Sequence, residues 1–590
     1  MIEDLRGGRT MRVIFERNVT IPMRDGVRLS ANLYRPEVGG PYPVLLTRHP
    51  YGKDTALSTA LLDPTVMAEA GYIVVIQDVR GRFASEGDFE SYAQEFEDGY
   101  DTVEWAASLP GSDGQVGMFG TSYFGYTQWQ AAAMRPPSLK AILPVMTYND
   151  AWYGSAVRGG ALEWGKLASW YTSAIALPEL MRKKRTDPNL PMMVAKLVSF
   201  YDQLPSKGLF ELPLSRFSIF RELDLLGDLF YEVFEHPNYD ATWEATSIRP
   251  HYDAIEIPSF HVGGWYDVFA QPTIDNYLEM KGRGRHTRLL MGPWSHTNYS
   301  GFVGDVDFGM AASAMVRDLK EDLTVFHRKW FDLTLKKSNA FGLADEPPVT
   351  LFVMGVNRWI SAEAWPLPDT HLTPFYLREG RAADAEQKSA RGWLSLDSPK
   401  REVSDAYDYD PADPVLSRGG NLLTHPVYGV GPHDQREIEK RPDVLLYTSD
   451  VLEEDLTVIG PIIAKLYVSS DAVDTDFVVR VCDVHPDGTS INIVDGIRRM
   501  RYRASSVAPS LMTPGEIYEV DVDLWSTAMV FQKGHRIRVH VTSSSFPHWD
   551  RNLNTGANNG TTAEMKVARN TVYHTEAYPS HVMLPIVTLA

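Results

Sequence analysis

The 590-residue sequence has one cysteine, Cys482, no long apolar run, and fewer basic than acidic residues. One cysteine excludes an intrachain disulfide and is typical of a reducing compartment. No segment reaches the roughly 20 apolar residues that span a bilayer, and Met1–Arg9 has no apolar signal-peptide core. A formal net charge of -19 argues against nucleic acid or anionic membrane as a partner. The sequence therefore predicts a cytoplasmic enzyme without a nucleic-acid or membrane partner.

Residues 1–148 alternate short apolar runs with helical patterns. The runs Tyr42–Thr47 and Tyr72–Gln77 are typical of strands covered on both faces. Helical patterns lie around 60–70 and 94–108. This alternation predicts a mostly parallel sheet with helices on both sides.

The pattern changes twice further along the chain. Large apolar residues recur at helical spacing over 149–246, which predicts a helical insertion, and the strand–helix pattern resumes over 247–347. Over 348–590, beginning with Thr350–Met354, short alternating strands separated by Pro- and Gly-rich turns predict an antiparallel sandwich or jelly roll.

The stretch Gly120-Thr-Ser122-Tyr-Phe-Gly125 joins an apolar run directly to a helical segment. A strand that turns into a helix over so few residues bends sharply, and it exposes the serine hydroxyl beside the N–H groups of the helix N-terminus. This is the geometry of a nucleophile elbow, although glycine stands three residues after Ser122 rather than two. The alternative is an ordinary serine at a helix N-cap.

Two further residues follow returning strands in the order expected for an α/β-hydrolase. Asp267 ends Gly-Gly-Trp-Tyr-Asp, and His296 ends Gly-Pro-Trp-Ser-His. Ser122, Asp267 and His296 then all lie at the carboxyl ends of strands, which is where such sheets bind ligands. Taken singly, an aspartate at this place is more often a helix cap, and a histidine such as His296 is more often an ordinary loop residue. Their joint order favours a catalytic triad.

With these motifs, the sequence resembles the cocaine esterase and X-Pro dipeptidyl-peptidase family of serine hydrolases, and within it the bacterial cocaine esterase branch. The matching stretches cover nearly the whole chain: Arg48–Lys53, Gln77–Gly87, Gly120–Gly125, Gly264–Asp267, Gly292–His296, Asp474–Phe477, Asp495–Arg503 and Ser543–Pro547. The family's own elbow is G-x-S-Y-x-G, so the displaced glycine is expected.

The resemblance implies an α/β-hydrolase domain, an inserted helical cap and a C-terminal jelly roll. It implies that Tyr51 donates its hydroxyl to the oxyanion hole together with the backbone N–H of Tyr123. Without the resemblance, Tyr51 would be interpreted as a buried core tyrosine. No metal and no cofactor is expected, and a homodimer is plausible for the family.

The residues around the triad favour esters with bulky apolar or aromatic acyl groups. The amino acid ester hydrolase branch binds an α-amino group with acidic residues, whereas here Val268, Phe269 and Ala270 follow Asp267 and the elbow carries Phe124. The expected substrate-binding residues are Phe124, Trp164, Trp170, Phe269 and Leu423. For the cap aromatics, core packing is the competing interpretation.

Two other functions stay open at this point. The same triad hydrolyses amides, as in a β-lactam side-chain or aminoacyl acylase, because esters and amides pass through the same kind of intermediate. A non-catalytic carbohydrate-binding protein is the alternative from another class, because jelly rolls often bind sugars. The complete triad favours a small-molecule ester hydrolase over both.

Overall fold

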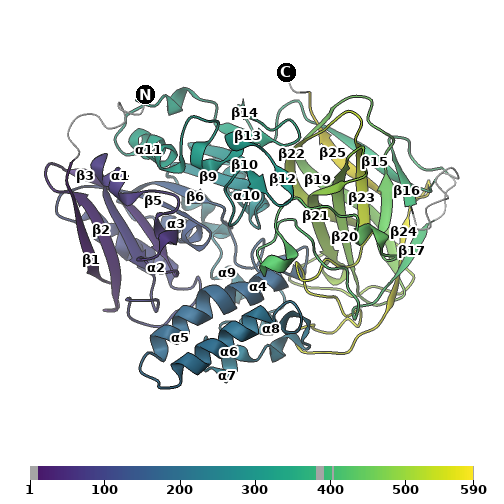
Figure 1. Cartoon of the computed structure of the whole chain (residues 1–590), viewed down its shortest axis with the longest axis horizontal. Coiled ribbons are helices and arrows are strands. Elements are labelled where there is room, and N and C mark those ends of the chain that lie inside the picture. The colour runs from purple at the N-terminus through teal and green to yellow at the C-terminus, as the bar shows by residue number, and fades with distance from the viewer. Residues whose placement is uncertain (1–10, 381–390, 401–403, 589–590) are drawn as a thin grey trace.

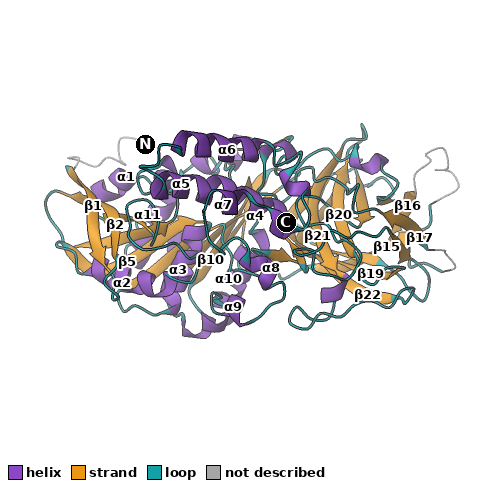
Figure 2. Ribbon diagram, turned by 90° about the horizontal axis from the view of Figure 1, so that it is seen from below, coloured by secondary structure: helices purple, strands orange, loops and turns teal. Residues whose placement is uncertain are grey.

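The computed structural model describes residues 11–380, 391–400 and 404–588, which form three parts (Figure 1). An α/β-hydrolase domain and a C-terminal β-domain lie side by side, and a helical cap packs below them. The two large sheets occupy opposite ends of an elongated molecule (Figure 2). Within these described ranges, no helix is both long and apolar enough to cross a membrane.

The described residues of the hydrolase domain form a ten-stranded sheet in the order β1-β2-β4-β3-β5-β6-β9-β10-β13-β14. The strands are β1 (Val13–Pro22), β2 (Arg28–Pro36), β3 (Tyr42–His49), β4 (Ile73–Asp78), β5 (Ser112–Thr121), β6 (Leu139–Val145), β9 (Ser259–Tyr266), β10 (Thr287–Ser295), β13 (Val349–Val353) and β14 (Arg358–Ala362). The strands from β4 across to β13 run parallel. Their carboxyl ends therefore meet at one edge of the sheet.

Helices cover both faces of this sheet, as the alternating pattern predicted. The helices are α1 (Pro64–Glu69), α2 (Glu95–Ala107), α3 (Tyr123–Ala133), α10 (Ala270–Gly282) and α11 (Leu323–Thr334). Val44 and Leu46 of β3 belong to the apolar core that α2 and α3 cover, whereas Leu45 belongs to the core that α1 and α11 cover. Successive strand residues point to opposite faces of the sheet, and both faces of β3 are buried. A continuous apolar run is therefore expected in this strand.

The segment from 149 to 246 forms the predicted helical cap, although its helices are shorter than the pattern suggested. It contains β7 (Val157–Arg158), β8 (Ala161–Leu162), α4 (Trp164–Trp170), a π-helical stretch (Tyr171–Ala176), α5 (Leu177–Lys183), α6 (Leu190–Asp202), α7 (Ile219–Glu222), α8 (Glu232–Glu235) and α9 (Ala241–Glu244). The helical pattern over 217–234 forms the two short helices α7 and α8 rather than one long helix, and the aromatic residues of this stretch pack in the cap core. The hairpin β7–β8 and the helix α6 had no counterpart in the predicted pattern.

The strand predicted over 350–354 forms, but in the first sheet rather than the second. β13 pairs in parallel with β10 and antiparallel with β14. The hydrolase sheet therefore continues to Ala362, past the boundary expected at residue 347. Met354 then bonds to the backbone of β22 through Ala528 and Val530, so the two domains are joined by backbone hydrogen bonds.

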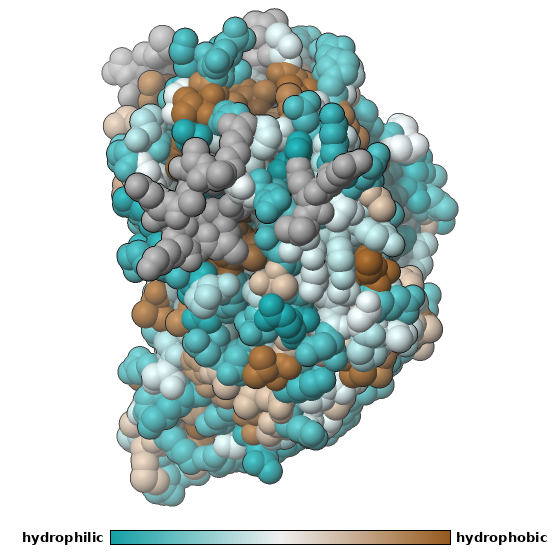
Figure 3. Space-filling view, turned by 90° about the vertical axis from the view of Figure 1, so that its right-hand side faces the viewer, coloured by the Kyte–Doolittle hydropathy of each residue, from teal (hydrophilic) through white to brown (hydrophobic). Residues whose placement is uncertain are grey.

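The described residues of the C-terminal domain form an eleven-stranded sheet. Its strands are β15 (His371–Arg378), β16 (Arg391–Ser395), β17 (Asp405–Tyr409), β18 (Leu445–Thr448), β19 (Leu456–Ser470), β20 (Asp476–Val484), β21 (Ser490–Arg499), β22 (Tyr518–Phe531), β23 (Arg536–Thr542), β24 (Ala568–Tyr573) and β25 (His581–Ile586). All pairs are antiparallel among the described strands except β16–β18. The far end of this domain is largely hydrophilic, with scattered apolar patches (Figure 3).

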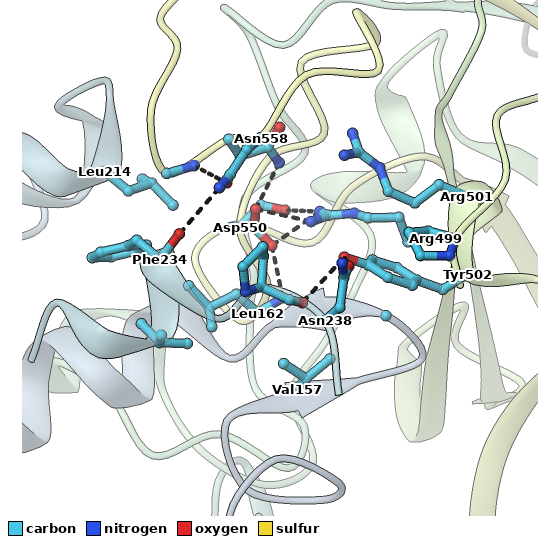
Figure 4. Close-up of a pocket in the computed structure, with 16 residues that line it drawn as sticks. Val157, Leu162, Leu214, Phe234, Asn238, Arg499, Arg501, Tyr502, Asp550 and Asn558 are labelled. Atoms are coloured by element: carbon cyan, nitrogen blue, oxygen red, sulfur yellow. Dashed lines mark hydrogen bonds and ion pairs between the residues drawn. The ribbon is translucent and has the colours of Figure 1, made fainter. Parts of the chain in front are cut away.

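The cap and the C-terminal domain meet around a cavity of about 250 Å³ (Figure 4). On its C-terminal side, the Arg499 guanidinium donates to the Asp550 carboxylate at 3.0 Å. Asn558 donates to the cap carbonyl of Phe234 at 3.1 Å, and Tyr502 donates to Asn238 at 2.9 Å. The cap is thus held by polar contacts as well as by its apolar core.

Candidate active site

The turn between β5 and α3 holds Ser122 in a backbone conformation that serine rarely adopts. Its φ of 59° and ψ of -125° place it in a region that favours glycine. Its side chain makes no capping hydrogen bond to α3, which removes the N-cap interpretation. Its backbone N–H donates to the carbonyl of Val145 at 2.9 Å, which ties the elbow to the end of β6.

Close packing explains both glycines of the elbow. A Cβ on Gly120, whose φ is +140°, would lie 2.4 Å from the Phe124 ring. A Cβ on Gly125 would lie 2.7 Å from the Thr147 side chain, whose hydroxyl donates to the Ser122 carbonyl at 2.7 Å. The glycine three residues after the serine is therefore required by contact between α3 and the loop after β6.

Asp267 and His296 lie in contact directly after β9 and β10. His296 Nδ1 and Asp267 Oδ2 are 2.6 Å apart, and both side chains are largely buried. The second carboxylate oxygen of Asp267 accepts the backbone N–H of Phe269 at 2.8 Å. Because Nδ1 donates to the carboxylate, the neutral imidazole keeps its lone pair on Nε2.

Ser122 and His296 are not joined by a hydrogen bond among the described residues. The Ser122 hydroxyl contacts the hydroxyl of Tyr51 instead. A serine and its base often become aligned only when substrate is bound. The structure therefore brings Asp267 and His296 together and places Ser122 at the end of β5 on the same sheet edge.

Tyr51 lies in the loop after β3 with its hydroxyl in the same cavity as Ser122. The Trp170 indole N–H donates to the phenolic oxygen at 3.1 Å. Burial raises the pKa of Tyr51 to about 12, against the opposing contacts with Trp170 and Ser122. The hydroxyl therefore keeps its proton at neutral pH. The Tyr51 N–H donates to His49 Nδ1 at 3.3 Å, which holds the loop in place. Burial lowers the pKa of His49 to about 3, so its ring is neutral and Nδ1 can accept this hydrogen bond.

The small cavity around Ser122, called the chamber below, has a volume of about 30 Å³. Six predicted site residues line it: Ser122, Tyr51, Tyr123, Trp170, Phe269 and Leu423. It adjoins a second cavity of about 560 Å³ under the cap, because Tyr92, Ser155 and Leu167 line both. The chamber holds little more than a water molecule, so the larger cavity is the space available for a bulky group.

Two predicted substrate-binding residues, Phe124 and Trp164, do not line the chamber. Phe124 is buried behind the chamber, with its ring 5.0 Å from that of His49 and 6.0 Å from that of Tyr51. Trp164 is fully buried in the cap core, where its indole N–H donates to the Leu209 carbonyl at 3.0 Å. Trp164 borders the larger cavity and not the chamber.

The sequence interpretation missed two polar residues of the site. Lys166 lines the chamber from α4, within the aromatic stripe that was expected to form its wall. Asn421 of the C-terminal domain donates to the backbone carbonyls of Trp265 and Asp267 at 2.9 and 2.8 Å. Lys166 could have been included from the sequence, because it is a charged residue on an otherwise apolar helix face. Nothing in the sequence pattern indicated Asn421.

One group of side chains in the described part of the chain has the spacing of metal ligands. Asp483, His485 and His535 offer atoms that lie within 4.8 Å of one another. Asp483 lies in β20, His485 follows that strand and His535 directly precedes β23, and none of the three borders the chamber.

Comparison with known proteins identifies the two main parts of the chain. Residues 25–298 match the model of the X-Pro dipeptidyl-peptidase (S15 family), and residues 339–583 match the X-Pro dipeptidyl-peptidase C-terminal non-catalytic domain. A cocaine esterase of Rhodococcus sp. (strain MB1 Bresler) is 42% identical over 585 residues, covering 97% of this chain and 98% of that protein. A putative serine esterase of Mycobacterium tuberculosis (strain CDC 1551 / Oshkosh) is 26% identical, with 90% of each chain covered.

Solved structures agree with this assignment. An α-amino acid ester hydrolase superposes with a TM-score of 0.80 at 27% identity, covering 98% of this chain and 97% of that one. An aminopeptidase from a marine sediment archaeon, Thaumarchaeota archaeon, superposes with a TM-score of 0.77 at 25% identity, with 98% and 97% covered. The resemblance seen in the sequence motifs is confirmed: the chain belongs to the cocaine esterase and X-Pro dipeptidyl-peptidase (S15) family of serine hydrolases.

Proposed function

We propose that the protein is a carboxylesterase that hydrolyses esters with bulky apolar or aromatic acyl groups through an acyl-enzyme on Ser122. The observation that carries the proposal is the 2.6 Å hydrogen bond between His296 Nδ1 and Asp267 at the strand ends beside the strained serine. This bond leaves Nε2 of His296 free to accept the serine proton. The 42% identity to a protein named as an esterase supports ester rather than amide chemistry.

In the first half-reaction, Ser122 Oγ attacks the ester carbonyl carbon while His296 accepts its proton. Asp267 stabilises the imidazolium that forms. The carbonyl oxygen becomes an oxyanion, which the Tyr51 hydroxyl and the Tyr123 N–H stabilise. Tyr123 is the first residue of α3, so its N–H has no acceptor within the helix.

The tetrahedral intermediate then collapses, and the alcohol leaves with the proton from His296. A water molecule gives its proton to His296 and attacks the acyl carbonyl, and the acid is released as Ser122 regains its proton. Trp170 assists by donating to the phenolic oxygen of Tyr51. The phenolic proton is then directed toward the oxyanion.

The substrate preference follows from the walls of the two cavities. Trp170, Phe269 and Leu423 give the chamber apolar surface. The adjoining 560 Å³ cavity has apolar cap side chains such as Leu167 and Phe230, and it is also lined by four acidic residues, Glu90, Asp228, Glu232 and Glu235. No acidic residue lines the chamber in the described part of the chain, so a substrate α-amino group finds no carboxylate there.

The test is hydrolysis of matched p-nitrophenyl esters and p-nitroanilides with acetyl, hexanoyl and benzoyl groups, by the wild type and Ser122→Ala. We expect the benzoyl and hexanoyl esters to be turned over fastest and all turnover to vanish in the variant. Ester turnover that survives in Ser122→Ala would overturn the nucleophile assignment. Anilides cleaved as fast as esters would favour the acylase alternative.

A further inference from the structure

Lys166 is a buried cation inside the chamber. It lies on α4, only 6% of its surface is exposed, and it lines the chamber together with Ser122 and Tyr51. A lysine is rarely buried to this extent without a charged partner. The proposed ester mechanism makes no use of it.

The ammonium of Lys166 is only partly satisfied. It donates to the backbone carbonyl of Ser155 and lies 4.9 Å from the centre of the Phe269 ring. Among the described residues, no carboxylate lies within 4.0 Å of it. An ammonium has three N–H donors, so the chamber retains donor capacity with a full positive charge behind it.

The nearest acidic residue on the same segment is directed elsewhere. Glu163, just before α4, accepts the Trp549 indole N–H at 3.1 Å and lies 3.6 Å from His548 Nε2, both in the C-terminal domain. Burial raises the pKa of Glu163 to about 7, and the positive charges of Lys166 and Arg158 oppose that shift. Glu163 and Asp267 act on Lys166 through their charge, but neither carboxylate lines the chamber, so the chamber itself offers the ammonium no acidic partner among the described residues.

Lys166 itself is largely protonated at neutral pH. Burial lowers its pKa to about 8, and the negative charges of Glu163 and Asp267 oppose that shift. His548, packed against the same region, is neutral because burial lowers its pKa to about 3. Of the other chamber side chains, Tyr92 and Tyr148 have pKa values raised by burial and remain uncharged donors.

We propose that Lys166 forms an anion subsite in the chamber and that the preferred esters carry a carboxylate close to the scissile bond. This rests on the proposed esterase function and specifies its substrate class. Because Lys166 and Ser122 line one small chamber, the anion lies within a few bonds of the ester. The bulky apolar part of the substrate then occupies the adjoining cavity. A charge-assisted hydrogen bond in this buried setting is stronger than one in water.

The test compares isosteric ester pairs that differ only in a carboxylate or a primary amide. One pair places the group on the acyl arm: monoethyl adipate and the ethyl ester of adipic monoamide. The other places it on the alcohol arm: 4-(benzoyloxy)butanoate and 4-(benzoyloxy)butanamide. We expect the wild type to favour the acid of at least one pair by about tenfold or more in kcat/KM. Lys166→Met should reduce that ratio to about one.

Lys140→Met is the matched control, because Lys140 also donates to a backbone carbonyl, that of Pro137, but on the surface. Its acid-to-amide ratio should equal that of the wild type. A wild type without a preference for either acid, or a preference that survives in Lys166→Met, would overturn the proposal.

A second measurement needs only the wild type, so it stands even if Lys166→Met fails to fold. The acid-to-amide ratio should fall as the pH rises above about 8, because Lys166 then loses its proton. The ratio cancels the pH dependence of the triad, which acts equally on both esters. A ratio that stays flat from pH 7 to 10 would contradict the proposal.

If neutral p-nitrophenyl esters are hydrolysed in a Ser122-dependent way without any acid preference, only the anion subsite fails. If no ester is hydrolysed, the proposed function itself fails.

Discussion

The side-chain amide of Asn421 donates to the backbone carbonyl of Asp267 at 2.8 Å, and to that of Trp265 at 2.9 Å. Asn421 is 3% exposed and belongs to the C-terminal domain, whereas Asp267 follows β9 of the hydrolase domain. The loop that carries the proposed catalytic aspartate is therefore held by another domain.

We predict that Asn421→Ala lowers kcat about 10- to 100-fold toward neutral esters, because a small displacement of Asp267 misorients His296. It also removes two buried hydrogen bonds, although the Asp267 carbonyl keeps the Ala270 N–H as a donor at 3.1 Å. The loss costs about 1–3 kcal/mol. The matched control is Asn558→Ala, which removes an amide donor to the Phe234 carbonyl at the cap interface. Equal kcat in the two variants would show that Asn421 has no special role in positioning Asp267.

Tyr51→Phe tests the proposed oxyanion hole. The ring and its contact with Phe124 remain, but the hydroxyl that would face the oxyanion is lost. We expect kcat to fall about 100- to 1,000-fold with little change in KM, because the lost bond forms only in the transition state. Tyr252→Phe, which removes a buried hydroxyl bonded to Asn276, is the control and should keep kcat. A Tyr51→Phe enzyme within a few-fold of the wild type would exclude this role.

Ser122→Gly tests the backbone strain of the elbow. Alanine at this position keeps a Cβ at a φ of 59°, whereas glycine adopts that conformation freely. Both Ser122→Ala and Ser122→Gly should be inactive. The free energy of unfolding of Ser122→Gly should exceed that of Ser122→Ala by about 1–3 kcal/mol. Differential scanning calorimetry of the two variants measures this difference as a higher transition temperature. Identical transition temperatures would mean that the elbow stores no strain.

Acid stability should depend on Glu439 in the C-terminal domain. It accepts from Arg538 at 2.6 Å and from His540 at 3.0 Å. Burial alone would raise the pKa of Glu439, but His540 and Arg538, with a hydrogen bond from Ser490, lower it from 4.5 to about 2. Because the folded-state pKa lies below the ordinary value, the stabilisation is complete above about pH 4.5 and is lost as the pH falls toward 2. It amounts to roughly 2–3 kcal/mol.

Glu439→Gln should remove that pH dependence. Thermal unfolding followed between pH 5 and 3 should show a steeper fall in transition temperature for the wild type than for the variant. Glu437→Gln is the matched control, because its exposed ion pair with Lys440 should contribute almost nothing. Parallel curves for the wild type and Glu439→Gln would contradict the assigned pKa.

The elements around the proposed triad were predictable because they follow local rules. A continuous apolar run such as Tyr72–Gln77 indicates a strand covered on both faces, and strand ends of a parallel sheet meet at one edge. Ser122, Asp267 and His296 each follow such a run directly. Their positions could therefore be inferred without knowledge of any long-range contact.

The errors arose where tertiary contacts decide the outcome. The strand over 350–354 alternates as an antiparallel strand does, yet it pairs with β10 because the hydrolase sheet has a free edge there. Trp164 and Trp170 are the first and last residues of α4, and only packing decides that Trp164 lies in the cap core beside the larger cavity while Trp170 contacts Tyr51. Asn421 is 154 residues from Asp267, so no local pattern links them.

The central claim is that Ser122 is the nucleophile, and active-site labelling tests it most directly. The protein is inactivated with diethyl p-nitrophenyl phosphate, and the modified peptide is located by mass spectrometry. We predict one diethylphosphoryl group per chain, on Ser122, with p-nitrophenol released in step with the loss of esterase activity and no labelling of Ser122→Ala. Inactivation with the group on any other residue would contradict the account.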